Sequence, residues 1–413
     1  MTRKSHARLA AALLVALMAF VAAPGAPASA ACSWKVVASP NDGSTNNELD
    51  AVSASSASNV WAVGANLGGS QVPIAEFWNG SKWTLFTPSF PNSGASFQGV
   101  VDVSKTETWA AGYSLKSGTT YEALTERWNG STWSQVAVKA GSGHATLLNG
   151  ITTVSSTERW AVGESIAPGA LGQTFAIHWG GKEWAATTTA NVPGEINVFG
   201  GTSGTSESDI WAVGVSGAGP SGPFKTLTEH WNGKSWSIVS SPNVGGASNF
   251  LQGVVAISTT DVWAVGYATT ASNSVTLTEH WNGKAWSIVK NPAVAQGRLF
   301  GVSAVATNNV FAVGQVGSGN FTTLTELWNG KSWAVVPSGN VNGVGDFLSA
   351  VAAVPATTNY WAVGGTLDSS LQYLGTLTEE YTCASLDGSF ARGFAPALPA
   401  LQQRVALPHM KVL

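Results

Sequence analysis

A tryptophan-rich segment recurs seven times along the chain, at intervals of about 50 residues. The run Val60-Trp61-Ala62-Val63-Gly64 returns in related form around Trp109, Trp160, Trp211, Trp263, Phe311 and Trp361. A second run, seen clearly at residues 226–236, follows the copies and adds two further tryptophans to each of the first six. A period of this length is typical of repeat folds, so it restricts the possible architecture more than any single motif does.

Each repeat is predicted to form four short strands. In the fifth copy, residues 251–257 make an apolar strand A and residues 262–266 make strand B. Strand C ends at the first tryptophan of the second run, strand D begins at the next, and Asn-Gly between them is typical of a tight hairpin turn. Four antiparallel strands in each radial repeat form a β-propeller blade. The sequence therefore predicts an all-β, seven-bladed β-propeller.

The two ends of the repeat array complement each other. The seventh copy reaches its strand C at residues 376–381 and has no strand D after it. Residues 34–41 near the amino terminus match the strand D segment at residues 236–243. We therefore expect the amino-terminal strand to complete blade seven and close the ring, with the propeller spanning residues 31–383.

The two cysteines lie at this closure. Aligning the copies places Cys32 and Cys383 on either side of the turn between strands C and D, where the chain is interrupted. A disulfide between them would replace the missing peptide link and suits an oxidising compartment. The alternative is a lipoprotein with a lipidated Cys32, but the usual Leu is missing three residues before it and Cys383 would stay unpaired.

Residues 1–30 are expected to form a secretory signal peptide. They have a basic start, an apolar run from Leu9 to Ala23, and Ala28-Ser29-Ala30 before the expected cleavage point. An uncleaved membrane anchor is the alternative, although the apolar run is shorter than the roughly 20 residues that span a bilayer. No later segment is expected to cross a membrane. The prediction is a secreted, extracellular protein whose tail, residues 384–413, is a flexible or loosely docked extension.

The order of motifs resembles the kelch repeat. Val-Gly ends strand B, an aromatic residue ends strand C and Trp opens strand D, while the Asn-Gly-Lys-x-Trp turn is similar to a shortened Asp-box. The chain thus resembles secreted bacterial Trp-rich β-propeller proteins over residues 31–383. It departs from kelch in keeping a glycine pair only at Gly364-Gly365, and from sialidase-type propellers in lacking their arginine triad. The resemblance therefore implies a fold but no activity.

Charge and residue spacing exclude several kinds of partner. The net charge is −3, and no basic run follows the first ten residues, so we expect no nucleic-acid partner. His178, His230 and His280 occupy equivalent positions in successive blades and cannot converge on one metal ion. We expect no metal and no cofactor.

Six glutamates repeat at one position of strand C, which indicates a structural role. They are Glu76, Glu126, Glu229, Glu279, Glu326 and Glu379. A single active site cannot use carboxylates spread around a ring. Because a buried carboxylate requires a partner, each is expected to accept a hydrogen bond from an indole N–H or a backbone group.

Function is sought where the repeat departs from its own pattern. The B-to-C and D-to-A loops vary in length and emerge on one face, which is the candidate binding surface. At the start of strand A, near the channel, the copies carry Asp50, Gln98, Asn149, Phe199, Gln252, Phe300 and Ser349. Amides with two aromatic rings suit a neutral, hydroxyl-rich ligand such as a sugar. The alternative is that these side chains pack between blades or cap the strands.

These features predict a secreted, non-catalytic and monomeric propeller that binds a glycan or an extracellular protein. One alternative is an extracellular hydrolase or lyase acting on polysaccharide, with acid and base drawn from residues such as Asp50, Glu48 and His144. Two carboxyl groups roughly 5 to 10 Å apart on the variable face would favour a hydrolase. A purely structural scaffold is the second alternative.

Overall fold

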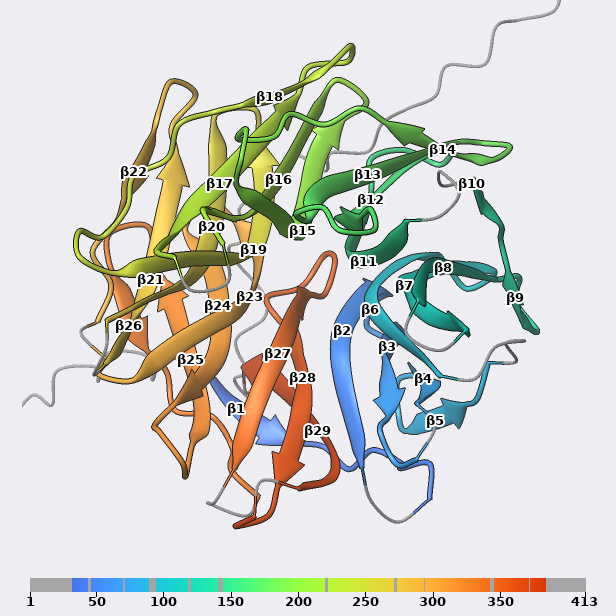
Figure 1. The fold of residues 1–413 in the computed structure, drawn as a ribbon. Helices are drawn as coiled ribbons and strands as arrows, with labels where there is room; N and C mark the ends of the chain where they lie inside the picture. The colour runs from blue at the N-terminus through green and yellow to red at the C-terminus, as the bar shows by residue number, and fades with distance from the viewer. Residues whose placement is uncertain are drawn as a thin grey trace, which may run out of the picture. The chain divides into compact units, whose positions relative to one another are not determined.

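Seven sheets are arranged in a ring (Figure 1), which confirms the predicted all-β propeller. The computed structural model describes residues 32–383 apart from 44–45, 70, 89–93, 118–119, 140–143, 220–221, 271–272, 293, 342–344 and 371. The expected signal peptide and tail lie outside the described residues, and residues 32–383 form one compact unit. Within these residues there is no helix with the length and apolar character needed to cross a membrane.

The first three blades have four strands each in the order A to D. They are β2 (Asn47–Ser56), β3 (Asn59–Asn66), β4 (Val72–Trp78) and β5 (Trp83–Phe86); β6 (Ala95–Ser104), β7 (Glu107–Ser117), β8 (Thr120–Trp128) and β9 (Trp133–Gln135); and β11 (Ala145–Thr153), β12 (Glu158–Ile166), β13 (Gln173–Gly180) and β14 (Trp184–Thr187). A short extra strand, β10 (Val138–Lys139), runs from blade two to pair in parallel with β14, which gives blade three a fifth strand.

Blades four to six repeat the same order. They are β15 (Ile196–Ser206), β16 (Asp209–Gly217), β17 (Phe224–Trp231) and β18 (Trp236–Ile238); β19 (Ser248–Ser258), β20 (Asp261–Thr269), β21 (Ser274–Trp281) and β22 (Trp286–Ile288); and β23 (Gly297–Ala306), β24 (Asn309–Val316), β25 (Thr322–Trp328) and β26 (Trp333–Val335). The Asn-Gly turns between strands C and D behave as predicted. In blade one, Asn79 Oδ1 accepts the backbone N–H groups of Ser81 and Lys82, while Gly80 takes a φ of 96°.

Blade seven is assembled from both ends of the described chain. It contains β27 (Asp346–Ala353), β28 (Tyr360–Leu367), β29 (Tyr373–Cys383) and β1 (Cys32–Val36). The amino-terminal strand β1 pairs antiparallel with β29, so that Trp34 lies opposite Tyr381 and Cys32 lies opposite Cys383. A disulfide joins these two cysteines, which are 351 residues apart in sequence. The predicted closure and its covalent link are both present.

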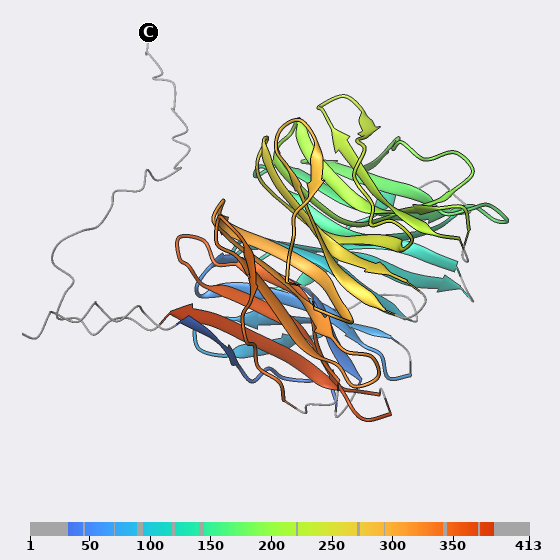
Figure 2. The same cartoon turned by 90° about the vertical axis from the view of Figure 1, so that its left-hand side faces the viewer.

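The hydrophobic core consists of seven layers, each between two neighbouring blades. Figure 2 shows the neighbouring sheets face to face. In each layer, the strand B aromatic residue of one blade contacts the two aromatic residues that flank the C-to-D turn of the next. Trp61 of blade one, for example, lies 5.1 Å from Trp128 and 5.2 Å from Trp133 of blade two between ring centroids. The repeated tryptophans therefore hold the blades to one another.

The repeated glutamates are fully buried, but their partners differ from the expectation. Glu229 accepts the backbone N–H of Ala190, and Glu379 accepts that of Gly339. Among the described residues, no backbone N–H donates to the other four glutamates. No indole N–H of these residues donates to any of the six, because the bonded indoles have other acceptors. Burial raises the pKa of Glu126 to about 7 and that of Glu279 to about 8.

Proline accounts for the missing donors at three of these sites. Ala190 and Gly339 each stand six residues after the strand D tryptophan of the blade that precedes their glutamate. The equivalent residues before Glu76, Glu279 and Glu326 are Pro40, Pro242 and Pro292. Because proline has no N–H, these blades cannot make the bond, and the carboxyl group stays without a backbone partner.

Candidate ligand-binding site at the channel mouth

A β-bulge near the start of every strand A builds the channel mouth. In all seven blades the pairing of strand A with strand B skips one residue. The skipped residues are Asp50, Gln98, Asn149, Gly200, Gln252, Phe300 and Ser349. A bulge releases its extra residue from the in-and-out alternation of a strand and redirects its side chain. Six of the seven predicted ring residues are these bulge residues.

Blade four differs from the prediction by one position. Phe199 pairs with Gly214 in register and is fully buried in the layer between blades three and four, where it lies 6.1 Å from Trp236. Gly200 is the bulge residue instead. Phe199 therefore borders the channel mainly as a core residue, and blade four contributes no side chain to the ring.

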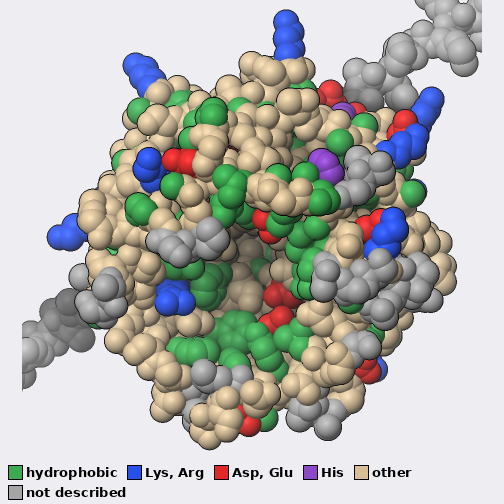
Figure 3. Space-filling model, viewed as in Figure 1, with side chains coloured by type: hydrophobic (Ala, Val, Ile, Leu, Met, Phe, Trp, Pro, Cys, Tyr) green, Lys and Arg blue, Asp and Glu red, His purple; other side chains and the backbone are tan. Residues whose placement is uncertain are grey.

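The bulge residues line a single cavity of about 470 Å³ at the centre of the ring. All seven residues predicted from the sequence border it: Asp50, Gln98, Asn149, Phe199, Gln252, Phe300 and Ser349. The hollow is visible in Figure 3, with hydrophobic and acidic side chains gathered around it. Apart from Phe199, these side chains are only half-buried, so their polar groups face a space that a ligand can enter.

Part of the ring is held in place by hydrogen bonds between blades. Gln98 Nε2 donates to Asp50 Oδ2 at 3.3 Å and to Ser96 Oγ at 2.9 Å, while Asn149 Nδ2 donates to the backbone oxygen of Phe199 at 2.8 Å. No hydrogen bond joins the Gln252 side chain to any of the described residues. Gln252 thus presents a free amide to the cavity, with both donor and acceptor capacity.

Small residues follow the ring residues in every blade. Each bulge residue is followed by glycine or alanine: Ala51, Gly99, Gly150, Gly201, Gly253, Gly301 and Ala350. A Cβ atom on Gly201 would lie 2.8 Å from the backbone oxygen of Gln252 in the next blade, closer than real contacts allow. Neighbouring inner strands therefore approach backbone to backbone. Sequence reasoning missed this close approach, although the repeated small residue was its visible signal.

The blade one side of the mouth is acidic. Burial raises the pKa of Asp50 well above its ordinary value, and the adjacent Glu48 raises it further, against the hydrogen bond from Gln98. Burial also raises the pKa of Glu48, which bonds to Tyr373 of blade seven. These carboxyl groups therefore keep their protons to higher pH than exposed ones do.

A second cavity of about 300 Å³ extends from the mouth across blade seven. It is lined by Glu48, Asp50, Phe300, Gln315, Phe321, Phe347, Ser349, Leu367 and Tyr373. Three of the rings form a continuous apolar surface, since Phe347 lies 6.4 Å from Phe321 and 6.1 Å from Tyr373 between centroids. We call this surface the blade seven platform.

The third residue of the hydrolase alternative is not part of this group. His144 belongs to blade three, hydrogen-bonds Ser165 at 3.2 Å, and lines none of the cavities that hold Glu48 and Asp50. The three strand C histidines also stay apart. His230 and His280 contact Asp209 at 2.7 Å and Asp261 at 2.8 Å, and His178 contacts Glu158. Among the described residues, no group of three or more His, Cys, Asp or Glu is placed to hold a metal ion.

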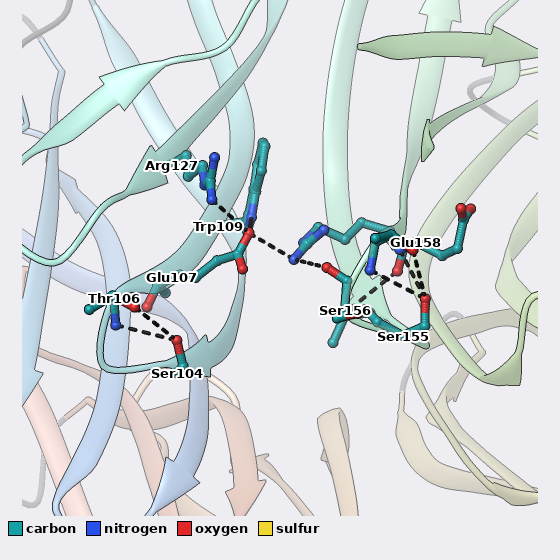
Figure 4. A network of polar contacts seen from close by, with 12 residues as sticks. Ser104, Thr106, Glu107, Trp109, Arg127, Ser155, Ser156 and Glu158 are labelled. Atoms are coloured by element: carbon teal, nitrogen blue, oxygen red, sulfur yellow. Dashed lines mark hydrogen bonds and ion pairs between the residues drawn. The ribbon is translucent and has the colours of Figure 1, made fainter. Parts of the chain in front are cut away.

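A separate charged network joins blades two and three (Figure 4). Glu107 Oε1 accepts from the Arg159 guanidinium at 2.9 Å and from the Trp109 indole at 3.0 Å, and Arg127 lies 3.2 Å away. Arg159 is buried and its guanidinium lies 5.1 Å from the Trp109 ring centroid. Two arginines thus share one carboxylate across the boundary between the blades, and this network stabilises the blade interface.

Comparisons with known proteins support the fold alone. No protein-family model matches the sequence, and no curated protein matches it either. Among solved structures, the chain is similar to "YCF48 bound to D1 peptide" (14% identity, 84% of this chain and 96% of that one, TM-score 0.51). It is similar to YCF48 from Cyanidioschyzon merolae at 14% identity over 84% of this chain and 98% of that one, with a TM-score of 0.50. At this identity the likeness shows a shared propeller architecture.

Proposed function

We propose that this chain is a secreted, non-catalytic binding module whose site is the channel mouth and whose ligand is a hydroxyl-rich glycan. The observation that carries the proposal is the convergence of the bulge residues on one cavity. These residues have no role in the core, yet they supply amides, a hydroxyl and a carboxyl group around one aromatic ring. Such groups match the paired donors and acceptors of a sugar.

The test is a glycan-binding screen on the purified protein, followed by titration of any glycan that binds. The decisive variant is Gln252→Ala, because this amide has no bond to the described residues and its loss leaves the fold intact. Replacing Gln98, Asn149 and Gln252 together should abolish binding, and Gln135→Ala on the exposed edge strand β9 serves as the matched control.

Binding that the Gln252 variant weakens and the Gln135 variant keeps would support the site. A screen with no binding would redirect the search to a protein ligand or to a scaffold role. Binding that survives the triple substitution would place the site elsewhere on the variable face.

One observation favours a polysaccharide hydrolase as the second candidate. Glu48 and Asp50 line the same cavity, and the Glu48 carboxyl raises the pKa of Asp50. Glycosidases use such a pair of neighbouring carboxyl groups, one of them with a raised pKa. Release of reducing sugar from polysaccharide, lost in both Glu48→Gln and Asp50→Asn, would establish the enzyme and displace the binding proposal.

Export is proposed from the leader sequence at residues 1–30. The disulfide supports it, since such bonds persist in oxidising compartments. Amino-terminal sequencing of protein recovered from the culture medium should begin at Ala31, after cleavage near Ala30. A protein retained in the cells with residues 1–30 attached would contradict export.

A further inference from the structure

A third cavity, next to blade six, contains a single charged side chain among its described lining residues. It has a volume of about 410 Å³, and its lining includes Asn273, Gln296, Arg298, Gln315 and Phe321. Arg298 is the charged residue, and hydroxyl and amide groups make up most of the rest. The cavity is therefore polar with one positive charge.

Arg298 is positioned but not neutralised. Its guanidinium lies 5.1 Å from the ring centroid of Tyr267, which keeps the side chain over the aromatic face. It makes no ion pair with any described residue, whereas Lys225 on the same face lies 3.9 Å from Glu195. An arginine that is held in place without a carboxylate can receive an anionic group from a ligand.

The same strand position carries opposite charges in two blades that flank blade seven. Arg298 directly precedes the buried Leu299 of β23, as Glu48 directly precedes the buried Leu49 of β2. Blade seven places Phe347 at this position. The acidic and basic residues thus stand at opposite ends of the blade seven platform.

The three cavities are adjacent and share lining residues, and we call the three together the groove. Gln315 and Phe321 line both the Arg298 cavity and the cavity over blade seven. Asp50, Phe300 and Ser349 line both the cavity over blade seven and the channel mouth. A ligand longer than one sugar unit can therefore reach from the mouth, across aromatic rings, to Arg298.

We propose that this groove binds an oligosaccharide that contains an acidic sugar, with its carboxylate on Arg298 and its neutral units on the platform and at the mouth. The inference rests on the proposed glycan-binding function and specifies the ligand class. The planar guanidinium pairs with a carboxylate through two parallel hydrogen bonds. Gln296 and Gln315 supply further donors beside it.

The experiment compares two ligands of equal length: an oligogalacturonate and the neutral oligosaccharide made by reducing its carboxyl groups. Calorimetric titration should show that the acidic oligomer binds at least about tenfold more tightly, since a hydrogen bond to a charged group contributes this much or more. Arg298→Gln should remove the difference and leave the affinity for the neutral oligomer unchanged. Lys225→Gln removes a positive charge from the same face outside the groove and should change neither affinity.

The outcomes separate this inference from the proposed function. If both oligomers bind equally to the unmodified protein, the acidic-sugar assignment is wrong and the glycan site stands. If neither binds, nor any glycan in the screen, both fail. If Lys225→Gln weakens the binding of the acidic oligomer as much as Arg298→Gln does, the preference reflects general electrostatic attraction. That result would overturn the assignment of the carboxylate to Arg298. A sulfated oligomer that binds more tightly than the oligogalacturonate would overturn the assignment to a carboxylate.

Discussion

Replacing Glu279 with glutamine should stabilise the protein strongly at neutral pH and hardly at all in acid. The Glu279 carboxyl is fully buried, accepts no hydrogen bond from the described residues, and has its pKa raised by burial from 4.5 to about 8. The unfolded chain ionises near the ordinary value, so folding at neutral pH requires this group to take up a proton. Because the pKa is raised on folding, the contribution of Glu279 to the free energy of unfolding is fully present below pH 4.5. It is lost as the pH rises through about 8.

The magnitude follows from the pH interval over which the unfolded chain is ionised. Each pH unit between 4.5 and 7 costs about 1.4 kcal/mol of unfolding free energy, so Glu279 lowers the stability by roughly 3 kcal/mol at pH 7. Glutamine has nearly the same shape and stays neutral. The substitution Glu279→Gln should therefore raise the free energy of unfolding by roughly 3 kcal/mol at pH 7 and by well under about 1 kcal/mol at pH 4.5.

Urea denaturation at these two pH values tests the prediction, with Glu207→Gln as the control. Glu207 is exposed, so its substitution makes the same charge change without altering a buried group. A gain of equal size at both pH values would mean that the amide improves local contacts and that ionisation is irrelevant. The absence of any gain at neutral pH would refute the reasoning outright, because it would mean that folding does not protonate Glu279.

Three further predictions follow from single contacts. Pro242→Ala should supply Glu279 with the backbone N–H that Glu229 receives and lower the pKa of Glu279 from about 8 towards the value of about 7 found for Glu229, which a carbon-detected NMR titration would measure. Gly201→Ala should destabilise the fold by about 1 to 3 kcal/mol or more through the contact with Gln252, whereas Gly245→Ala, with open space around it, should be neutral in thermal melting. Replacing Cys32 and Cys383 together with serine should cost roughly 2 to 5 kcal/mol, and reducing agent should lower the melting temperature of the unmodified protein alone.

The ring architecture could be predicted because it depends on position along the chain. Seven copies of one pattern specify seven blades, and Trp34 matches the strand missing from the last copy. Once that strand is assigned to blade seven, Cys32 must stand opposite Cys383, as the pairing of β1 with β29 shows. Each step needs only the alignment of the repeats.

Other features depend on pairing between elements and could not be read from the repeats alone. In blade four, the bulge falls at Gly200 and not at the predicted ring residue Phe199, because Phe199 pairs with Gly214 of β16. The partners of the buried glutamates required knowing that the segment after strand D of one blade meets strand C of the next. Pro242 and Pro292 were visible in the sequence, but their consequence was not.

The bulge explains why variation concentrates on one face. Residues on either side of it, such as Leu49 and Ala51, are restricted by the core and by the close approach of neighbouring strands. The bulge residue carries an amide, a carboxyl, a hydroxyl or a phenyl group in six blades, whereas in blade four a Cβ atom on Gly200 would lie 3.1 Å from the backbone oxygens of Leu251 and Gln252. The C-to-D turns at the opposite edge have less freedom, since their second residue takes a positive φ that favours glycine. A seven-fold scaffold thus carries different side chains at one repeated inner position, and this is where we propose the ligand site.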